Sequence, residues 1–160
     1  SRAACDQNPV LVSDPLAALR LKSYVWPDQP ERLARLDAAI ALAVSAGVVV
    51  EKSDAADWLA ARLAARPQTG LTVVYHSVFL QYPPAEVRRA LVEMLEAAGA
   101  EATPARPLAW LCFEPASLLR DPDQAGITPS DFITWLKTWP GSNIRRFLRS
   151  DGHVTQIVAT

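Results

Sequence analysis

Half of the 160 residues are hydrophobic and 21% are charged, a composition that excludes an intrinsically disordered chain. Sixteen basic and seventeen acidic residues give a net charge of −1, so we expect neither a nucleic acid nor a membrane surface as partner. The longest nearly apolar run, residues 38–50, is too short to span a bilayer. We expect no signal peptide, because no basic segment followed by an apolar segment opens the sequence. We therefore expect a cytoplasmic protein.

The first third of the chain predicts two helices and a short strand. Asp14 before a proline is a typical helix start, and Asp28 with Glu31 forms a capping box before a second helix that ends at Gly47. The valine run at residues 48–50 predicts a short buried strand. The apolar residues expected on the inner face of the second helix are Leu33, Leu36, Ile40 and Val44.

The rest of the chain alternates helices with strands and then turns to strands alone. Helices are expected over residues 55–65 and 83–99, and strands over residues 71–75, 108–113, 132–139, 144–149 and 153–158. A proline-containing loop is expected over residues 121–130. This order predicts an α/β fold with a three-layer, Rossmann-like sheet that is mostly parallel and ends in an antiparallel C-terminal hairpin.

Several kinds of site are excluded by the placement of glycine, histidine and cysteine. The six glycines are too far apart for a GxGxxG or P-loop phosphate cradle. His76 and His153 cannot form an HExxH motif, and Cys5 and Cys112 are distant in sequence, so we expect no metal site. Ser77 lies outside any GxSxG motif and should face away from its neighbour His76, which disfavours a hydrolase that uses Ser77 or His153.

Polar residues follow each of the three predicted buried strands. Asp54 comes after the first strand, His76 and Ser77 after the second, and Glu114 after the third. Because ligands of open parallel sheets bind outside the carboxyl ends of the strands, we expect a site at this edge. Each residue also has a structural interpretation: a helix N-cap for Asp54, a histidine bonded to backbone for His76, a hydroxyl bonded to backbone for Ser77, and a rim ion pair for Glu114. Tyr82 is expected to be half-buried.

Many uncommon residues in a constant order resemble those of a known family. They include the strings Cys5-Asp6-Gln7-Asn8-Pro9, Tyr24-Val25-Trp26-Pro27-Asp28-Gln29, Val74-Tyr75-His76-Ser77-Val78, Glu114-Pro115 and Gly152-His153. Over nearly its whole length the chain resembles an uncharacterised bacterial family, domain of unknown function 2332. That family is similar to class I S-adenosylmethionine-dependent methyltransferases. The first strand and glycine-containing loop of those enzymes are not in this chain, and it starts at Ser1 without a methionine. We therefore expect a single domain over residues 1–160 that is a C-terminal fragment of a longer protein.

The resemblance implies S-adenosylmethionine as the cofactor. It places Asp54 and Ala55 where methyltransferases hold the adenine amino group, and His76 and Ser77 beside the methyl group and the substrate. Glu114 would line the side of the acceptor, which is an unspecified small molecule or protein. The alternative is a non-catalytic, Rossmann-like binding or assembly scaffold. Without its first strand, such a scaffold would expose a sheet edge and could form a homodimer through it.

Overall fold

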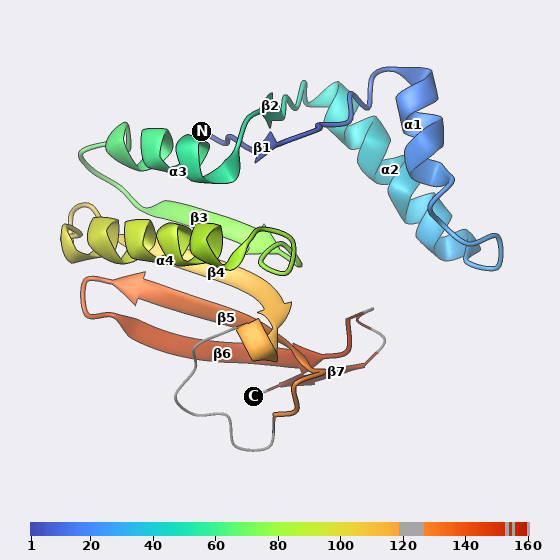
Figure 1. The fold of residues 1–160 in the computed structure, drawn as a ribbon. Coiled ribbons are helices and arrows are strands. Elements are labelled where there is room, and N and C mark those ends of the chain that lie inside the picture. The colour runs from blue at the N-terminus through green and yellow to red at the C-terminus, as the bar shows by residue number, and fades with distance from the viewer. Residues whose placement is uncertain (119–126, 153, 155, 160) are drawn as a thin grey trace. The chain divides into compact units, whose positions relative to one another are not determined.

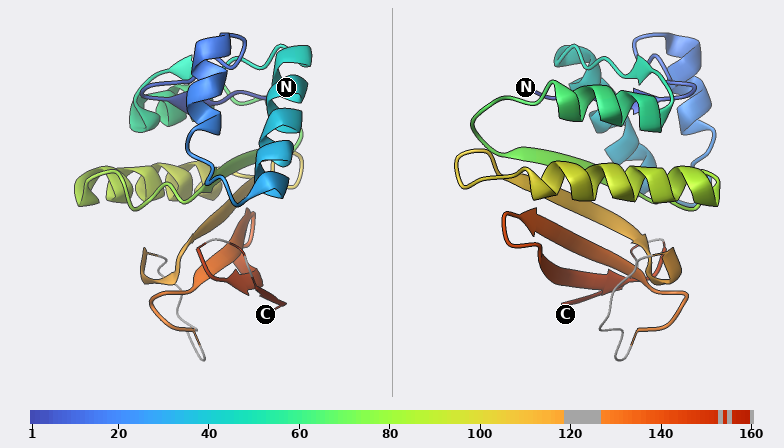
Figure 2. Two further views of the ribbon diagram at one scale, coloured as in Figure 1. Left: turned by 90° about the vertical axis from the view of Figure 1, so that its right-hand side faces the viewer. Right: turned by 60° about the vertical axis from the view of Figure 1, so that its left-hand side comes forward.

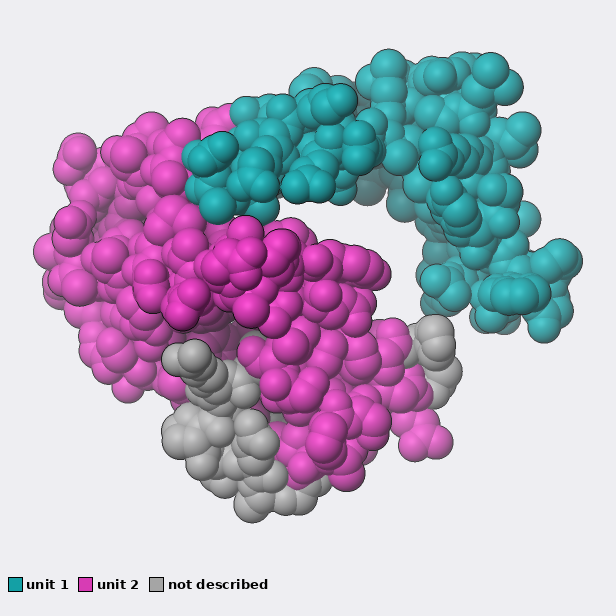
Figure 3. All heavy atoms as spheres, in the orientation of Figure 1, with its two compact units in different colours: residues 1–58 teal, residues 59–160 magenta. Residues whose placement is uncertain are grey.

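The computed structural model describes residues 1–118, 127–152, 154 and 156–159. The chain divides into two compact units, Ser1–Trp58 (unit 1) and Leu59–Thr160 (unit 2), which are coloured separately in Figure 3. Every residue that is buried in the described part of the chain belongs to unit 2. The predicted loop at residues 121–130 lies largely outside the described residues, and so does His153.

Unit 1 contains the helices α1 (Pro15–Lys22) and α2 (Pro30–Ser45) (Figure 1). Asp14 caps α1 as predicted, because its Oδ1 accepts a hydrogen bond from the Leu16 N–H at 3.0 Å. The predicted capping box of α2 is wrong. Gln29 occupies the N-cap without a side-chain hydrogen bond, since Pro30, whose backbone is already set for a helix, takes the first helical position. Gly47 follows the helix with φ +60, as its predicted place at the helix end requires.

The first strand of the chain is not where the valine run predicts it. Residues 48–50 are irregular, and the strand β2 is Glu51–Lys52, which pairs in parallel with β1 (Cys5–Asp6). Strand pairing starts at Glu51, because this is where the chain comes next to the segment around β1: the Glu51 N–H donates to the Ala4 carbonyl at 2.8 Å. β-branched residues favour a strand only when a neighbouring strand is available to them, and Val49 is 76% exposed instead.

The inner face predicted for α2 is also wrong, because neither α1 nor α2 contributes a buried residue. Leu33 and Val44 are exposed, and Leu36 and Ile40 are only half-buried. The periodicity identifies the helix correctly, but no other described element of unit 1 covers that face closely enough to bury it.

Unit 2 is built on a five-stranded sheet in the order β3-β4-β5-β6-β7 (Figure 1). Its strands are β3 (Thr72–Ser77), β4 (Leu108–Pro115), β5 (Phe132–Trp139), β6 (Asn143–Ser150) and β7 (Ile157–Ala159). The α/β class is confirmed. The sheet is mixed rather than mostly parallel, because β3 and β4 form its one parallel pair among the described strands. The connection from β5 to β6, residues 140–142, is far too short for a parallel crossover and imposes an antiparallel pair.

The core of unit 2 lies between this sheet and α4 (Ala85–Ala100), the helix that joins β3 to β4 and runs along one face of the sheet (Figure 2). Alternate residues of β4 face this helix: Leu108, Trp110, Cys112 and Glu114. Gly99 is required on α4, because a Cβ there would lie 2.4 Å from the Trp139 ring. The helix α3 (Ala55–Ala64) spans the boundary between the units and buries Leu59.

Candidate functional site

The carboxyl ends of β3 and β4 bring His76 and Glu114 together, as their positions after two neighbouring parallel strands predict. The register pairs His76 with Cys112, so Glu114 lies two residues further along β4 on the same face. The His76 Nδ1 atom is 2.7 Å from the Glu114 Oε1 atom. Unit 2 therefore holds a histidine–carboxylate pair at this edge of its sheet, with the carboxylate buried and the histidine partly buried.

Glu114 is fully buried, which corrects the expected rim ion pair. The alternation that begins at Leu108 places Glu114 on the face covered by α4. Three hydrogen bonds compensate its loss of water: Oε1 accepts from His76 and from the Phe79 N–H at 2.8 Å, and Oε2 accepts from the Leu80 N–H at 3.2 Å. Two of these donors belong to the loop that follows β3, so the carboxylate fixes the start of that loop.

His76 is held through both ring nitrogens. The Trp110 indole donates to the His76 Nε2 atom at 2.8 Å. Because an indole N–H can only donate, Nε2 must accept and carries no proton, and the single ring proton is on Nδ1, where it is donated to Glu114. The imidazole is thus neutral and keeps no free lone pair. Its partners are side chains, so the expected histidine bonded to backbone is also corrected.

Aromatic contacts surround this cluster. The His76 ring packs edge-on against Phe79 with centroids 5.7 Å apart, and Trp110 meets Trp135 at 4.9 Å in a T-shaped contact. The His76 side chain is 16% exposed. We call His76, Trp110 and Glu114 the histidine cluster. Its geometry suits the positioning of a loop better than proton transfer.

Ser77 points away from the histidine cluster. β3 continues through Ser77, and its alternation leaves Ser77 exposed while His76 is half-buried on the opposite face. The two side chains therefore do not form a nucleophile–base pair, as the alternation predicts. Ser77 is instead available to solvent at the carboxyl end of the strand.

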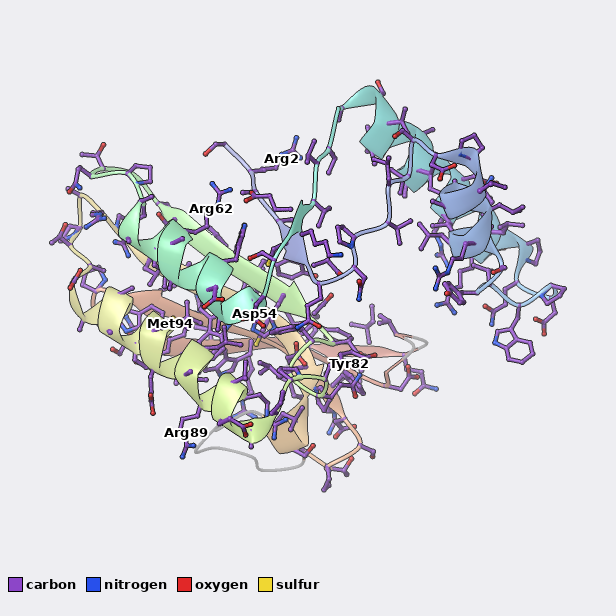
Figure 4. The ribbon with its side chains drawn as sticks, turned by 45° about the horizontal axis from the view of Figure 1, so that its top comes forward. Arg2, Asp54, Arg62, Tyr82, Arg89 and Met94 are labelled. Carbon is purple, nitrogen blue, oxygen red and sulfur yellow. The ribbon has the colours of Figure 1, made fainter. Side chains whose placement is uncertain are left out.

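The loop from Val78 to Pro84 presents an aromatic side chain, Tyr82, whose exposure the sequence analysis did not predict. Arg88 donates to the Pro83 carbonyl at 2.7 Å, and Glu114 holds the loop's other end. Val78 has φ 50, an uncommon conformation for a β-branched residue. Tyr82 is 75% exposed rather than half-buried, because the anchors use main-chain atoms and leave its side chain free; Figure 4 labels it.

Asp54 lies in unit 1, where it caps α3. Its Oδ1 accepts from the Ala56 N–H at 2.8 Å, so the predicted N-cap is confirmed, and Ala55 is the first residue of the helix. Its Oδ2 accepts from the Gln7 amide at 3.4 Å, and the residue is exposed (labelled in Figure 4). The five predicted site residues thus fall into two groups, Asp54 and Ala55 in unit 1 and His76, Ser77 and Glu114 in unit 2.

Cys112 lies beside the histidine cluster but is not a reactive thiol. Burial, and to a smaller extent the Glu114 carboxylate, raises the pKa of Cys112 to about 12. Within the described ranges, no group of three or more histidine, cysteine, aspartate or glutamate side chains is placed to hold a metal ion. No helix in the described part of the chain is long and apolar enough to cross a membrane.

Comparison with known proteins identifies a family and no activity. The family model described as "Uncharacterized protein conserved in bacteria (DUF2332)" matches residues 1–158, so the chain belongs to that family. No curated protein and no solved structure matches the chain.

Proposed function

We propose that this DUF2332 chain forms part of an S-adenosylmethionine-binding domain that transfers a methyl group to a small-molecule or protein acceptor. The proposal rests on one observation, which is that the two carboxylate oxygens of Asp54 make different contacts. One carboxylate oxygen caps α3, and the other is met only by Gln7 at 3.4 Å among the contacts of the described residues. Oδ2 can therefore exchange a long amide hydrogen bond for one from the adenine amino group.

The histidine cluster acts in this proposal by positioning. Methyl transfer depends chiefly on aligning the acceptor with the sulfonium methyl group, and it does not require a base when the acceptor is already nucleophilic. Glu114, itself bonded to His76, holds the loop after β3. This loop exposes Tyr82, and Ser77 is the strand residue directly before it. We assign Ser77 and Tyr82 to the acceptor side, and His76 and Glu114 to its support.

Calorimetric titration of S-adenosylhomocysteine into this chain, and into the longer parent protein of which we propose it is part, tests the proposal. The informative variant is Asp54→Asn. Its amide oxygen can still cap α3, whereas its NH₂ group would replace Oδ2 and repel the adenine amino group. We expect at least tenfold weaker binding, about 1.4 kcal/mol. Asp14→Asn makes the same change at the cap of α1 and should bind like wild type. Absence of binding to the parent protein, or unchanged binding by Asp54→Asn, would reject the proposal.

A non-catalytic scaffold is the second candidate function. The observation that favours it is the position of β3 at one end of the sheet, with no strand paired to its outer side in the described chain. If neither the chain nor the parent protein binds S-adenosylhomocysteine, assembly through this edge becomes the leading explanation of the fold.

A further inference from the structure

The outer edge of β3 carries backbone groups that have no partner among the described residues. The Thr72 N–H donates to the carbonyl of Pro107, the residue before β4, at 3.1 Å, and the Val78 N–H donates to the Phe113 carbonyl of β4 at 2.8 Å. Backbone groups alternate in direction along a strand, so those of Val73, Tyr75 and Ser77 point to the opposite side. On this side no described strand is paired with β3, which is the first strand of the sheet order.

The sequence of this edge has none of the residues that normally prevent strand addition. Residues 71–77 contain no charged residue and no proline. Three apolar or aromatic side chains are largely exposed there, Leu71 at 62%, Val73 at 52% and Tyr75 at 62%. Edge strands of monomeric proteins are usually short, charged or interrupted. β7, at the other end of this sheet, has three residues, whereas β3 has six.

We propose that β3 pairs antiparallel with β3 of a second copy of this chain, joining two five-stranded sheets across a two-fold axis. The residues whose backbone N–H and C=O groups point to the outer edge set the register. Tyr75 lies opposite Tyr75 of the second copy, and Val73 lies opposite Ser77. In this register each outward-facing residue exchanges hydrogen bonds with its counterpart. Val74 then lies opposite His76 on the face toward α4.

A second copy suits this edge because the strand is complementary to itself. No charge is brought opposite a like charge, and the net charge of −1 gives little long-range repulsion between copies. The central Tyr75 pair adds an aromatic cross-strand contact, which is among the favourable pairs in antiparallel sheets. Two-fold dimers are also the commonest closed assembly. The inference uses groups of unit 2 alone, and it rests on the second candidate function, assembly through the edge of β3, rather than on the proposed methyl transfer.

Sedimentation velocity over a concentration series tests the pairing, with two variants and a matched control. Val73→Pro removes an outward N–H and spares the ladder to β4, and proline is tolerated at such an edge position. Tyr75→Lys places two ammonium groups opposite each other on the two-fold axis. Leu11→Lys adds the same charge at a residue of unit 1 that is 67% exposed. We expect a wild-type dimer, the same dimer for Leu11→Lys, and at least tenfold weaker dimerisation for both edge variants.

Circular dichroism establishes whether each variant is folded. If Val73→Pro does not fold, Tyr75→Lys alone decides the outcome. A wild-type chain that stays monomeric at the highest concentration would overturn the proposal. A dimer that survives Tyr75→Lys would also overturn it. Protection of the Val73 and Tyr75 amides from hydrogen exchange in a monomer would overturn it in favour of cover by another segment of polypeptide.

Discussion

Glu114→Gln is the substitution that best tests how the histidine cluster holds unit 2 together. Glutamine keeps the shape of the side chain but replaces one carboxylate oxygen by an NH₂ group. The native carboxylate accepts from three donors, the His76 ring and the N–H groups of Phe79 and Leu80. The amide oxygen can still accept hydrogen bonds from His76 and from the Phe79 N–H. The NH₂ group then faces the Leu80 N–H, and because both groups are donors no hydrogen bond forms between them.

The expected loss of stability follows from these contacts. A hydrogen bond to a charged group contributes about 1.5–3 kcal/mol, and a buried donor left without a partner costs about 1–3 kcal/mol. Because Glu114 is fully buried, no water screens or replaces the lost contact. We expect the free energy of unfolding of unit 2 to fall by about 3 kcal/mol. For a unit of this size, such a loss lowers the melting temperature by roughly 10–20 °C.

Urea denaturation followed by tryptophan fluorescence, with calorimetry for the melting temperature, measures this loss. Glu96→Gln is the matched control. Glu96 is 42% exposed and pairs with Lys137, which is 13% exposed, and the amide oxygen introduced at position 96 can still accept from the Lys137 ammonium group. Exposed and half-exposed ion pairs contribute at most about 1 kcal/mol, so the control should remain near wild type. If Glu114→Gln were as stable as Glu96→Gln, the Glu114 carboxylate would not anchor the loop after β3.

Two further predictions concern the core of unit 2. Gly99→Ala should destabilise it by about 1–3 kcal/mol in urea denaturation, because the new Cβ would lie 2.4 Å from the rigid Trp139 ring; unchanged stability would mean that α4 and the ring can separate freely. In a thiol-labelling time course near pH 8, Cys112 should react only after unfolding, since its pKa of about 12 and its burial keep it protonated and inaccessible. Cys5, which is only partly buried, should react first in the native protein, and equal labelling rates would contradict this order.

The sequence predicts the elements of unit 2 well because their patterns are local. Gly99 sits near the end of a helix that runs one residue beyond the predicted limit, and β5 and β6 lie within one residue of their predicted ranges. The last strand, expected over residues 153–158, is shorter and later, because β7 is Ile157–Ala159. The meeting of His76 with Glu114 also follows from sequence, since neighbouring parallel strands end at one edge. Trp110 as the partner of His76 does not follow, because it depends on the cross-strand register, which no local pattern specifies.

The errors have one physical origin, which is that burial is a property of neighbours and not of the segment itself. The valine run at residues 48–50 has strand propensity but no partner strand among the described residues, and pairing begins at Glu51 instead. Leu33 has helical spacing but is 37% exposed rather than buried. Glu114 shows the reverse case: a charged residue expected at the rim is buried because alternation along β4 turns it inward.

The protonation of His76 tests most directly whether the histidine cluster positions a loop or moves protons. A long-range proton–nitrogen correlation spectrum near neutral pH distinguishes the two neutral tautomers of an imidazole from its charged form. His153→Gln leaves His76 as the one histidine of the chain and assigns its signals. We expect a neutral ring with its proton on Nδ1, and we expect Trp110→Phe to disturb the Nε2 signal specifically. A ring protonated at Nε2, or a charged ring, would contradict the positioning role and return His76 to proton transfer.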